Sequence, residues 1–485
     1  MNTLGIDIGT SSVKIALLGD ADHVIATASR ALHVSRPHAG WSEQDAADWW
    51  TAIEQGMDEL HASHAAELAE VVAIGLSGQM HGATLLDAQG QLLRPCILWN
   101  DGRSGPQCER LTRDWPGLHA VTGNLAMPGF TAPKLMWVAE HEPDVFARVA
   151  TVLLPKAYVR WCLSGELAED MSDASGTLWL DVAQRDWSAA ALAATGMRRE
   201  QMPRLVEGNA VSGTLKPELA ARWGFKQAPV IAGGAGDNAA GAVGLGAIHA
   251  GDAFVSLGTS GVLWATTAAY APAPARAVHA FCHALPGTWH QMGVLLSAAA
   301  SLAWWAGVTG LSESELLAEL GADPAPSGCW FGPYLNGERT PHNDAHVQGG
   351  FLGLSGGTTR ADMTLAVLEG VAYAMRDAQQ ALASAGTVLH EADIIGGGAR
   401  SPLWCQTMAD VLGITLHQVA ESEIGCALGA ARLARMAAGE PLSALRKPVR
   451  LRSFIPRPER AAQHAQRHAR WQQLYPVLSG FSSKT

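Results

Sequence analysis

The chain has 485 residues, 48% of them hydrophobic, which is enough for more than one domain and for large buried cores. A formal net charge of −11, with no long run of Lys or Arg, argues against a binding surface for nucleic acid or for an anionic membrane. The seven cysteines are scattered and form no CxxC pair, which argues against a disulfide framework or a zinc site and favours the cytoplasm. No apolar run reaches the ~18 residues of a membrane span, and the N-terminus lacks the pattern of a signal peptide.

The first predicted element is a strand–turn–strand unit over residues 4–17, LGIDIGTSSVKIAL. β-Branched residues flank a hydroxyl-rich turn that contains Thr10 and Ser11, and Asp7 stands just before the turn in an apolar run. A carboxylate in such a run is costly unless a cation meets it. A metal ion carrying phosphate would meet it, with the amides and hydroxyls of the turn on the phosphate oxygens. The alternative is a plain β-hairpin whose Asp7 faces solvent.

The same kind of turn recurs at residues 254–263, FVSLGTSGVL. Aligned on their first glycines, the two units pair Gly9 with Gly258, Thr10 with Thr259, Val13 with Val262 and Asp7 with Ser256. Only the first unit therefore carries the acid. This is what two half-sites facing one polyphosphate would look like, so the sequence predicts two related halves that hold a nucleotide between them.

A helix is predicted to begin at residues 41–45, WSEQD, where Ser42 and Asp45 form a capping-box pattern. The apolar residues that follow recur at helical spacing and predict a buried stripe of Trp49, Ile53, Met57 and Leu60. Farther along, residues 71–76, VVAIGL, form a continuous apolar run of the kind found in buried strands.

The loop after that strand, residues 77–82 with the sequence SGQMHG, is a candidate ligand site. Ligands bind just past the carboxyl ends of strands in open α/β sheets, and the two glycines allow a small molecule to approach the backbone. Gln79 and His81 bring polar groups, and Met80 brings a soft apolar wall. A purely structural histidine is the alternative for His81.

Two further polar segments have open roles. Residues 97–103, ILWNDGR, predict a strand and a loop in which Asn100, Asp101 and Arg103 either recognise a polyol or form an internal salt bridge. Residues 170–177, DMSDASGT, are predicted to form a set of structural turns rather than a substrate contact.

The run over residues 229–246, PVIAGGAGDNAAGAVGLG, predicts a strand, a glycine-rich loop and a small-residue helix that begins near Asp237. A carboxylate at a helix start lies near the positive end of the helix dipole. Asp237 is therefore either a helix cap or a general base aimed at a hydroxyl, with Asn238 fixing the neighbouring oxygen. The glycines favour the base, because close approach of a ligand to the backbone requires them and a cap does not.

Two features are predicted between the second hairpin and the last strands. Glu338 and Arg339 are expected to form an ion pair that fixes a loop near the junction of the halves. Thr359 and Asp362 form a capping-box pattern that opens a long amphipathic helix, and Gly386 is a fitting stop for it.

Residues 392–404, ADIIGGGARSPLW, predict a strand, three glycines and a helix with Ser401 as N-cap and Pro402 in its first turn. Gly397 and Gly398 would let a nucleoside lie against bare backbone. Two pairs of segments mirror each other across the halves, namely 71–82 with 392–403 and 236–241 with 425–430. The halves thus resemble one ancestral unit that was doubled.

Together these motifs resemble the FGGY carbohydrate kinases over nearly the whole chain. The matching segments are DIGTSSVK at 7–14, WSEQD at 41–45, GQMHGATLLD at 78–87, ILWNDGR at 97–103, GNLAMPGFTAPKLMWV at 123–138, GDNAAGAVG at 236–244, SLGTSG at 256–261, FCHALP at 281–286, GERTPH at 337–342 and IGGGAR at 395–400. The resemblance implies an α/β fold of duplicated actin-like ATPase (ribonuclease H-like) domains with a central cleft. We expect an N-terminal domain over 1–245, with the sugar site and the catalytic base, and a C-terminal domain over 246–485, with the second phosphate loop and the adenosine site.

The resemblance further implies ATP-dependent phosphorylation of D-xylulose at its 5-hydroxyl, because the QMHGAT run at 79–84 is similar to that of bacterial members acting on xylulose. The implied residues are Asp237 and Asp7 for catalysis, Gln79, Met80, His81, Asp237 and Asn238 for the sugar, Asp7 for Mg²⁺, and Thr10, Ser11, Gly258, Thr259, Gly397, Gly398 and Arg400 for ATP. A homodimer is implied by the resemblance alone.

Two other functions stay open. One is a family member that phosphorylates another ketose or polyol, such as ribulose, glycerol or gluconate. The other is a nucleotide-switched ATPase such as actin or the heat-shock chaperone ATPases, which share the hairpin pair but have no small-molecule pocket. The QMHG and GDN segments favour a kinase, because they predict a polar pocket that faces the phosphates.

Overall fold

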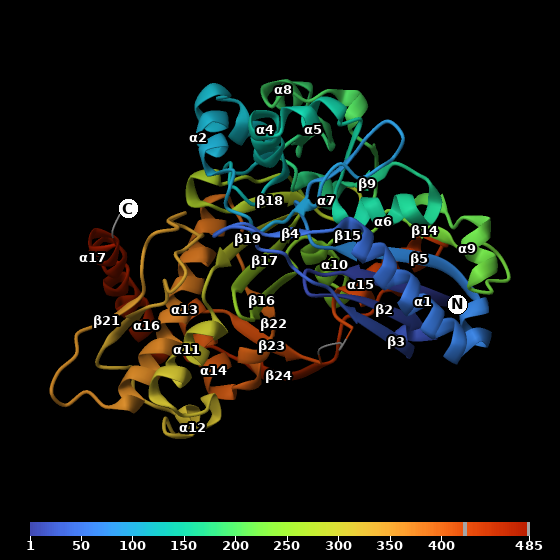
Figure 1. Cartoon of the computed structure of the whole chain (residues 1–485). Coiled ribbons are helices and arrows are strands. Elements are labelled where there is room, and N and C mark those ends of the chain that lie inside the picture. The colour runs from blue at the N-terminus through green and yellow to red at the C-terminus, as the bar shows by residue number, and fades with distance from the viewer. Residues whose placement is uncertain (421–423, 483–485) are drawn as a thin grey trace.

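The computed structural model describes residues 1–420 and 424–482 and contains two seven-stranded mixed sheets, one in each half of the chain (Figure 1). The order is β13-β14-β5-β1-β2-β3 in the first sheet, with β15 also paired to β5, and β18-β19-β17-β16-β22-β23-β24 in the second. The first sheet comprises β1 (Asn2–Ile8), β2 (Ser12–Leu18), β3 (Val24–Ala31), β5 (Val71–Gly78), β13 (Val211–Thr214), β14 (Val230–Ala232) and β15 (Ala235–Gly236). The second comprises β16 (Ala253–Leu257), β17 (Gly261–Thr267), β18 (His279–Cys282), β19 (Trp289–Leu295), β22 (Glu391–Ile395), β23 (Thr415–Val419) and β24 (Arg450–Phe454).

The two sheets share one topology. In each, a hairpin is followed by a parallel partner, so β1 pairs with β2 and β5 as β16 pairs with β17 and β22. A second parallel strand and an antiparallel edge strand follow on this side of each sheet, β14 with β13 and β23 with β24. On the other side of each hairpin an antiparallel strand is added, β3 beside β2 and β19 beside β17. Asp7 pairs with Ser77 as Ser256 pairs with Ile395, which confirms the predicted equivalence of Asp7 and Ser256.

The two hairpins differ in the length of their turns. Ile8 pairs with Val13 across the first turn, whereas Leu257 pairs with Gly261 across a turn that is one residue shorter. Val262 therefore lies opposite Ser256, in the place that Lys14 takes opposite Asp7. The predicted pairing of Val13 with Val262 is wrong in structural terms, because a shift of one residue moves a side chain to the other face of a sheet.

One face of the first sheet packs on α1 (Ala46–Ala69), and the predicted stripe of Trp49, Ile53, Met57 and Leu60 is buried there. The helix begins one residue after Asp45, which caps it by accepting a hydrogen bond from the amide of Ala47. Ser42 is not part of the cap, so the predicted capping box is wrong. Its amide instead donates to Asp101 Oδ2 at 2.6 Å, just before the short strand β4 (Glu43–Gln44).

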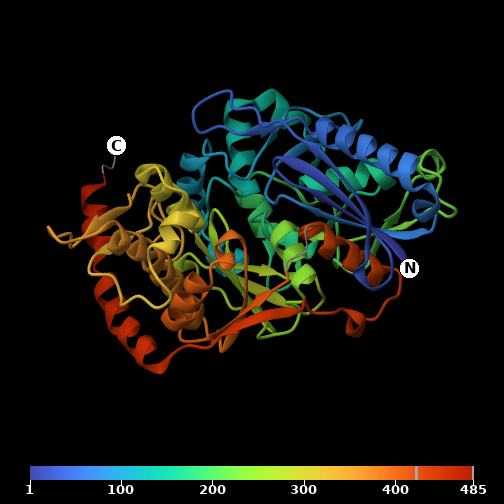
Figure 2. The same cartoon turned by 90° about the horizontal axis from the view of Figure 1, so that it is seen from below.

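The other face of the first sheet carries α15 (Cys426–Ala437), a helix of the C-terminal half (Figures 1 and 2). The contact requires bare backbone. A Cβ atom on Gly5 would lie 1.9 Å from the carbonyl oxygen of Ala427, and one on Gly75 would lie 1.8 Å from that of Ala430. Gly429 in turn faces α10 (Asp237–Leu245), where its Cβ would lie 1.8 Å from the oxygen of Ala240. After most of the second sheet the chain thus returns to the N-terminal half, and the first residues of α15 lie beside Asp237.

One face of the second sheet is covered by α11 (Ala299–Thr309), α13 (Arg360–Ser384), α14 (Pro402–Leu412) and α16 (Pro458–Trp471). The capping box of Thr359 and Asp362 at the start of α13 is confirmed, as is the N-cap Ser401 of α14. Phe254 and Trp264 on the other face join Phe130 and other residues of the N-terminal half in one hydrophobic cluster. The two halves therefore share a core.

The shorter elements surround the sheets. The helices are α2 (Gly105–Asp114), α3 (Leu118–Thr122), α4 (Thr131–His141), α5 (Pro143–Arg148), α6 (Pro155–Ser164), α7 (Met171–Ser175), α8 (Ala189–Ala194), α9 (Pro217–Arg222), α12 (Glu313–Ala318) and α17 (Leu474–Phe481). The strands are β6 (Thr84–Leu86), β7 (Cys96–Ile97), β8 (Thr151–Leu153), β9 (Ala168–Asp170), β10 (Leu180–Asp181), β11 (Asp186–Trp187), β12 (Arg204–Val206), β20 (Trp330–Gly332) and β21 (Gly350–Leu352). Among the described helices, none has the length and apolar character needed to cross a membrane.

Candidate functional site

Asp7 and Asp237 lie at the same edge of the first sheet. Strands β1, β5 and β15 run parallel there, with Ile8 beside Gly78 and Gly78 beside Gly236. Asp7 precedes this row by one residue, and Asp237 follows it by one at the start of α10. The meeting of parallel strand ends therefore brings together two carboxylates that are far apart in sequence, at the place where ligands bind in such folds.

Burial raises the pKa of Asp237 to about 6, and the charge of Asp7 adds to the rise. The amide and side chain of Asn238 oppose it, donating to Asp237 Oδ1 at 2.7 and 2.8 Å. Both of these bonds fall on one oxygen, so Oδ2 is the carboxylate oxygen that can accept a proton from a ligand. A carboxylate with this pKa is suited to general-base catalysis near neutral pH.

Asp7 fits a metal ligand. Burial raises its pKa, while the neighbouring Ser77 hydroxyl and the charge of Lys14 work against the rise. Its Oδ1 is buried and has no hydrogen-bond partner among the described residues. Such an oxygen costs free energy unless a cation joins it, and carboxylate oxygen is the ligand that Mg²⁺ prefers.

Met80 and His81 form a wall next to Asp237. A Cβ atom on Gly236 would lie 2.8 Å from Met80 Cγ, and one on Gly176 would lie 2.6 Å from His81 Nδ1. His81 Nδ1 is 2.7 Å from the carbonyl oxygen of Gly176, which can only accept, so Nδ1 carries the proton and Nε2 is an acceptor. Burial lowers the pKa of His81 to about 3, which keeps the ring neutral. The wall thus offers a sulfur and one acceptor nitrogen.

Gln79 lies under the first turn and not in this wall. Its side-chain amide accepts from the hydroxyl of Thr10 at 2.9 Å and donates to Gln44 at 2.8 Å. Gln44 in turn donates to the carbonyl of Thr10, and the indole of Trp99 donates to the hydroxyl of Thr10 at 3.0 Å. The structure therefore gives Gln79 a place that shapes the turn, and it adds Gln44 and Trp99, which lie in the matching segments 41–45 and 97–103 but were assigned no role from the sequence. Ser11, also in this turn, is exposed.

The second turn is built in another way. The amides of Ala298 and Ala299, at the start of α11, donate to the carbonyls of Thr259 and Gly258 at 2.9 and 2.8 Å. The triple glycine lies next to this turn, since a Cβ on Gly396 would lie 2.7 Å from the carbonyl carbon of Leu257. This contact brings the two predicted nucleotide segments of the C-terminal half together.

The three predicted nucleoside residues differ in surroundings. Gly397 is exposed, and a Cβ there would meet nothing within 4 Å. Gly398 is buried, and its Cβ would lie 2.9 Å from Leu257 Cβ, so it serves packing. Arg400 is exposed. Gly397 is therefore the position with open space for a ligand.

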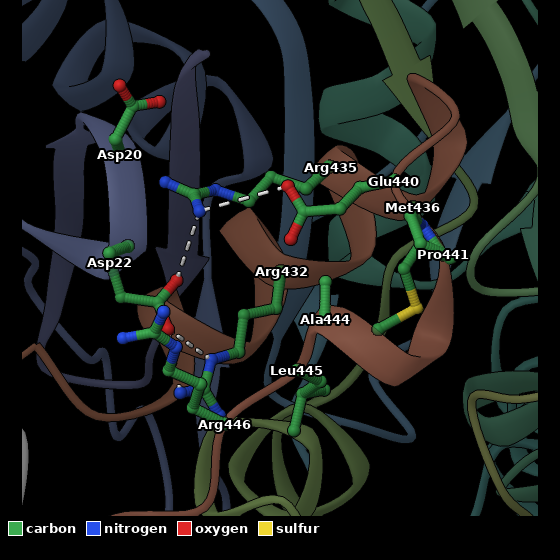
Figure 3. Close-up of a pocket in the computed structure, with 11 residues that line it drawn as sticks. Asp20, Asp22, Arg432, Arg435, Met436, Glu440, Pro441, Ala444, Leu445 and Arg446 are labelled. Carbon is green, nitrogen blue, oxygen red and sulfur yellow. Dashed lines mark hydrogen bonds and ion pairs between the residues drawn. The ribbon is translucent and has the colours of Figure 1, made fainter.

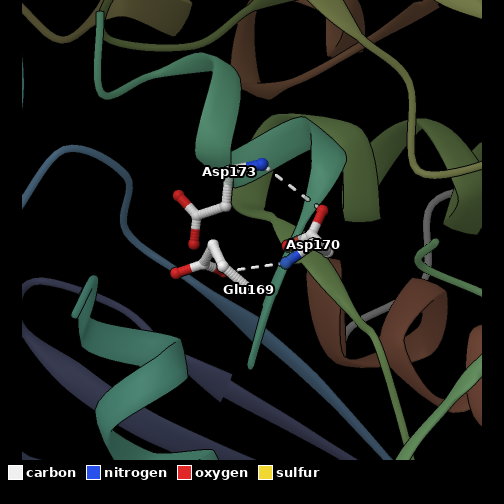
Figure 4. Close-up of side chains that lie close together, drawn as sticks. All are labelled: Glu169, Asp170 and Asp173. Carbon is white, nitrogen blue, oxygen red and sulfur yellow. Dashed lines mark hydrogen bonds between the residues drawn. The ribbon is translucent and has the colours of Figure 1, made fainter. Parts of the chain in front are cut away.

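A buried ionic cluster, which was not among the features predicted from the sequence, holds the loop before Asp237. Glu169, Asp170 and Asp173, at the end of β9 and the start of α7, place carboxylate oxygens within 4.8 Å of one another (Figure 4). Lys156 Nζ lies 2.5, 2.7 and 3.4 Å from them. We interpret the cluster as a salt-bridge centre and not a metal site, because the ammonium group already occupies the space between the acids.

The cluster reaches the glycine-rich loop through hydrogen bonds. Ser172 Oγ donates to Asp170 Oδ1 at 2.5 Å and accepts from the amide of Gly236 at 3.1 Å. Arg160, one helical turn after the lysine of the cluster, donates to the carbonyl of Gly233. The segment 170–177, for which structural turns were favoured over a substrate contact, thus contains the short helix α7, and Ser172 of this helix fixes the residue before Asp237.

The loop at residues 97–103 resolves in favour of the internal salt bridge. Arg103 Nη2 lies 2.7 Å from Asp101 Oδ2, and its Nη1 lies 2.7 Å from Glu43. The predicted strand is short, since only β7 precedes this loop. Asn100 is exposed.

A cavity of about 190 Å³ lies at the far end of α15 from Asp237 (Figure 3). Arg432 binds Asp22 Oδ2 at 2.8 Å, and Arg435 lies 3.6 Å from the other oxygen of this acid. Arg432 also donates to the carbonyls of Val243 and Gly244, at the end of α10. The cavity therefore lies where the arginines of α15 bind residues of the N-terminal half.

Comparison with known proteins places these features in a family. The model for the N-terminal domain of the FGGY family of carbohydrate kinases matches residues 2–244, and that for the C-terminal domain matches residues 253–438. A protein of Escherichia coli (strain K12) named xylulose kinase is 48% identical over 480 residues, covering 98% of this chain and 99% of the relative. Its counterpart in Bacillus subtilis (strain 168) is 37% identical over 441 residues, covering 90% and 88%.

Solved structures agree. One from Brucella ovis, named xyloylose kinase, has a TM-score of 0.97 and 49% identity, covering 99% of this chain and 100% of that one. The glycerol kinase of Plasmodium falciparum with ADP, 19% identical, has a TM-score of 0.87 with 98% of each chain covered, so it shares the fold. The expected duplicated actin-like fold is confirmed, and the chain belongs to the FGGY family of carbohydrate kinases.

Proposed function

We propose that this carbohydrate kinase transfers the γ-phosphoryl group of ATP to the 5-hydroxyl of D-xylulose and so produces D-xylulose 5-phosphate in xylose catabolism. The observation that carries the proposal is Asp237, whose free oxygen and pKa of about 6 stand beside the wall of Met80 and His81. The relatives named xylulose kinase, which match at up to 48% identity over nearly the full chain, support the choice of sugar.

In the proposed mechanism the 5-hydroxyl oxygen of the sugar attacks the γ-phosphorus of ATP, and ADP leaves. Asp237 Oδ2 accepts the proton of this hydroxyl. Asn238 holds the other carboxylate oxygen, which fixes the direction of Oδ2. His81 accepts a hydrogen bond from a second sugar hydroxyl at Nε2, and Met80 packs against the carbon chain. Phosphoryl transfer depends mostly on such positioning and on electrostatic stabilisation.

The nucleotide is proposed to lie across both hairpins. Thr10 and Ser11 of the first turn, with Gly258 and Thr259 of the second, would hold the polyphosphate through amides and hydroxyls. Gly397 would face the adenosine, and Gly398 and Arg400 belong to the same short 3-10 helix, Gly397–Arg400. Mg²⁺ would be held by Asp7, directly or through water, and would neutralise charge on the phosphates.

We also propose the division into domains 1–245 and 246–485, since α10 ends at Leu245 and β16 begins at Ala253. Helix α15 of the C-terminal domain packs on the sheet of the N-terminal domain and would then link Asp237 to the C-terminal domain. All seven cysteines are free thiols, which is consistent with the proposed cytoplasmic location. A homodimer stays a prediction that light scattering can check.

An assay of ADP release with a panel of sugars tests the proposed function. D-Xylulose is expected to give a kcat/KM about 10²-fold or more above that of D-ribulose, glycerol and gluconate, because a site that hydrogen-bonds its substrate rejects analogues with misplaced groups. A higher kcat/KM with another sugar would replace the substrate. ATP hydrolysis that no sugar stimulates would instead favour a nucleotide-switched ATPase.

The pH profile of kcat/KM for D-xylulose is expected to fall on the acid side with a pKa of about 6, because Asp237 works as a base only when deprotonated. Asn238→Ala should move this acid limb up by about one pH unit, since it removes a hydrogen bond that favours the charged form. Asn100→Ala, at an exposed asparagine, is the control that should leave the limb in place. A limb that does not move in Asn238→Ala means that another group titrates.

A further inference from the structure

The ring of His81 belongs to a box of aromatic side chains built by both halves of the chain. Its centroid lies 4.7 Å from that of Phe130, which in turn lies 5.8 Å from the ring of His279. His279 and Phe281, both on β18, stack at 5.6 Å. Phe130, His279 and Phe281 are buried, whereas His81 keeps part of its surface exposed. The box therefore opens on the side of His81.

Arg339 joins this box from the loop that follows β20. Its Nη1 lies 3.2 Å from His279 Nε2. A guanidinium group only donates, so Nε2 must be the acceptor and Nδ1 must carry the proton. Nδ1 lies 2.9 Å from the side-chain oxygen of Asn124, which accepts that proton, and Asn124 Nδ2 donates to the carbonyl of Ala280. One tautomer thus satisfies the whole relay and fixes the direction of the guanidinium.

The guanidinium of Arg339 lacks the partner that the sequence suggested. No ion pair between Glu338 and Arg339 is formed among the described residues; Glu338 Oε1 instead accepts from the amides of Leu296 and Arg339 at 3.0 and 2.8 Å. Burial raises the pKa of Glu338 to about 8, so this side chain is mostly neutral at pH 7. Within the described part of the chain, the bond to His279 is the only hydrogen bond of the guanidinium.

Four of the five N–H groups of Arg339 are therefore open, although the side chain is largely covered and keeps only part of its surface exposed. No nitrogen of this guanidinium is among the described side-chain atoms that are both fully buried and without a hydrogen-bond partner, so a ligand oxygen can reach the open donors. Lys134, the other basic side chain near the box, is less suited to this role, because it is fully buried, burial lowers its pKa to about 7, and Nζ already donates to the carbonyls of His81 and Gly129 at 3.0 and 2.7 Å. Arg339 is thus a donor of fixed direction, and it has N–H groups that can bind an acceptor oxygen of a ligand.

We propose that Arg339 determines sugar specificity by binding the carbonyl end of an open-chain ketose, a role that rests on the proposed function. The contacts run from Asp237 along Gly236 and Met80 to His81 and then through the box, so Arg339 stands at the end remote from the base. A ketone oxygen has no proton to give and requires a donor, which the guanidinium supplies. The hydroxyl groups nearer the base meet the acceptors His81 Nε2 and Asp237 Oδ2.

Arg339→Gln in the full-length enzyme tests this assignment. The KM for D-xylulose is expected to rise about 10- to 100-fold, because a hydrogen bond from a charged donor is lost. The KM for ATP should stay within about twofold, since Arg339 lies at the sugar end of the site. In Arg339→Ala, millimolar guanidinium ion should restore part of the lost kcat/KM. Arg36→Gln, at an exposed arginine outside the site, is the control without effect.

The outcomes separate this inference from the proposed function. An unchanged KM for D-xylulose in Arg339→Gln, with wild-type enzyme active on that sugar, overturns the assignment alone. Equal rises in the KM for both substrates, together with a lower melting temperature and no rescue by guanidinium, would make Arg339 structural and also overturn it. Wild-type enzyme that is inactive on D-xylulose would contradict the proposed function itself.

Discussion

Asp237→Asn is expected to lower kcat for D-xylulose by about 10²- to 10⁴-fold, which is the range that a general base contributes. The amide is nearly isosteric with the carboxylate but cannot accept the proton of the sugar hydroxyl. The KM for ATP should change by less than about twofold, because Asp237 lies with the sugar wall and not in either hairpin turn. Steady-state kinetics with a coupled ADP assay measure both quantities.

The same substitution is expected to stabilise the protein at neutral pH. Burial and the charge of Asp7 raise the pKa of Asp237 from 3.8 to about 6 in the folded state. Above pH 6 the charged carboxylate therefore opposes folding, by about 1–3 kcal/mol, and this cost disappears as the pH falls below about 4. The difference in unfolding free energy between Asp237→Asn and wild type should shrink along the same range.

Asp114→Asn, at an exposed carboxylate, is the matched control and should leave both turnover and stability unchanged. Near-normal turnover in Asp237→Asn would exclude this residue as the base. A variant that is both inactive and less stable than wild type would point to a structural role for Asp237 instead.

Gly429→Ala is expected to cost about 3 kcal/mol or more of unfolding free energy. Its Cβ would lie 1.8 Å from the carbonyl oxygen of Ala240, and backbone cannot move aside as a flexible side chain can. Helix α15 would have to shift away from α10. Activity of the folded fraction should also fall, because Cys426 at the start of α15 contacts the carbonyl of Asp237 at 3.2 Å.

Gly307→Ala in α11 is the control for this variant, since a Cβ there would meet nothing within 4 Å. Alanine favours a helix interior over glycine by roughly 0.5–1 kcal/mol, so this change should be neutral or stabilising. Chemical denaturation of both variants gives the comparison. Wild-type stability in Gly429→Ala would mean that α10 and α15 are not packed as closely as described.

Local sequence patterns were sufficient to predict the strands and turns that carry the site. The β-branched residues around Gly9 and Gly258 give two hairpins, and helical spacing from Trp49 onward gives the core of α1. The register of the second hairpin could not be predicted, because one residue less in its turn has no signature of its own. The packing of α15 on the first sheet could not be predicted either, because small residues in a helix indicate a close contact but not the element that makes it.

The site itself was predictable where chemistry shows in sequence. Asp7 and Asp237 stand out as carboxylates beside glycines, and they meet because their strands are neighbours. Lys156 was missed, although a lysine and an arginine one turn apart in the apolar stretch of α6, followed by EDMSD, is a usable signal of a buried ionic cluster. The predicted ion pair of Arg339 with Glu338 was wrong, because adjacent residues of opposite charge need not face each other.

A crystal structure with D-xylulose and a non-hydrolysable ATP analogue is the most direct test of the central claim. We expect the phosphates to contact both Thr10 and Thr259 and the 5-hydroxyl to lie within hydrogen-bond distance of Asp237 Oδ2. Phosphates held by one hairpin only, or a sugar whose 5-hydroxyl points away from Asp237, would contradict it.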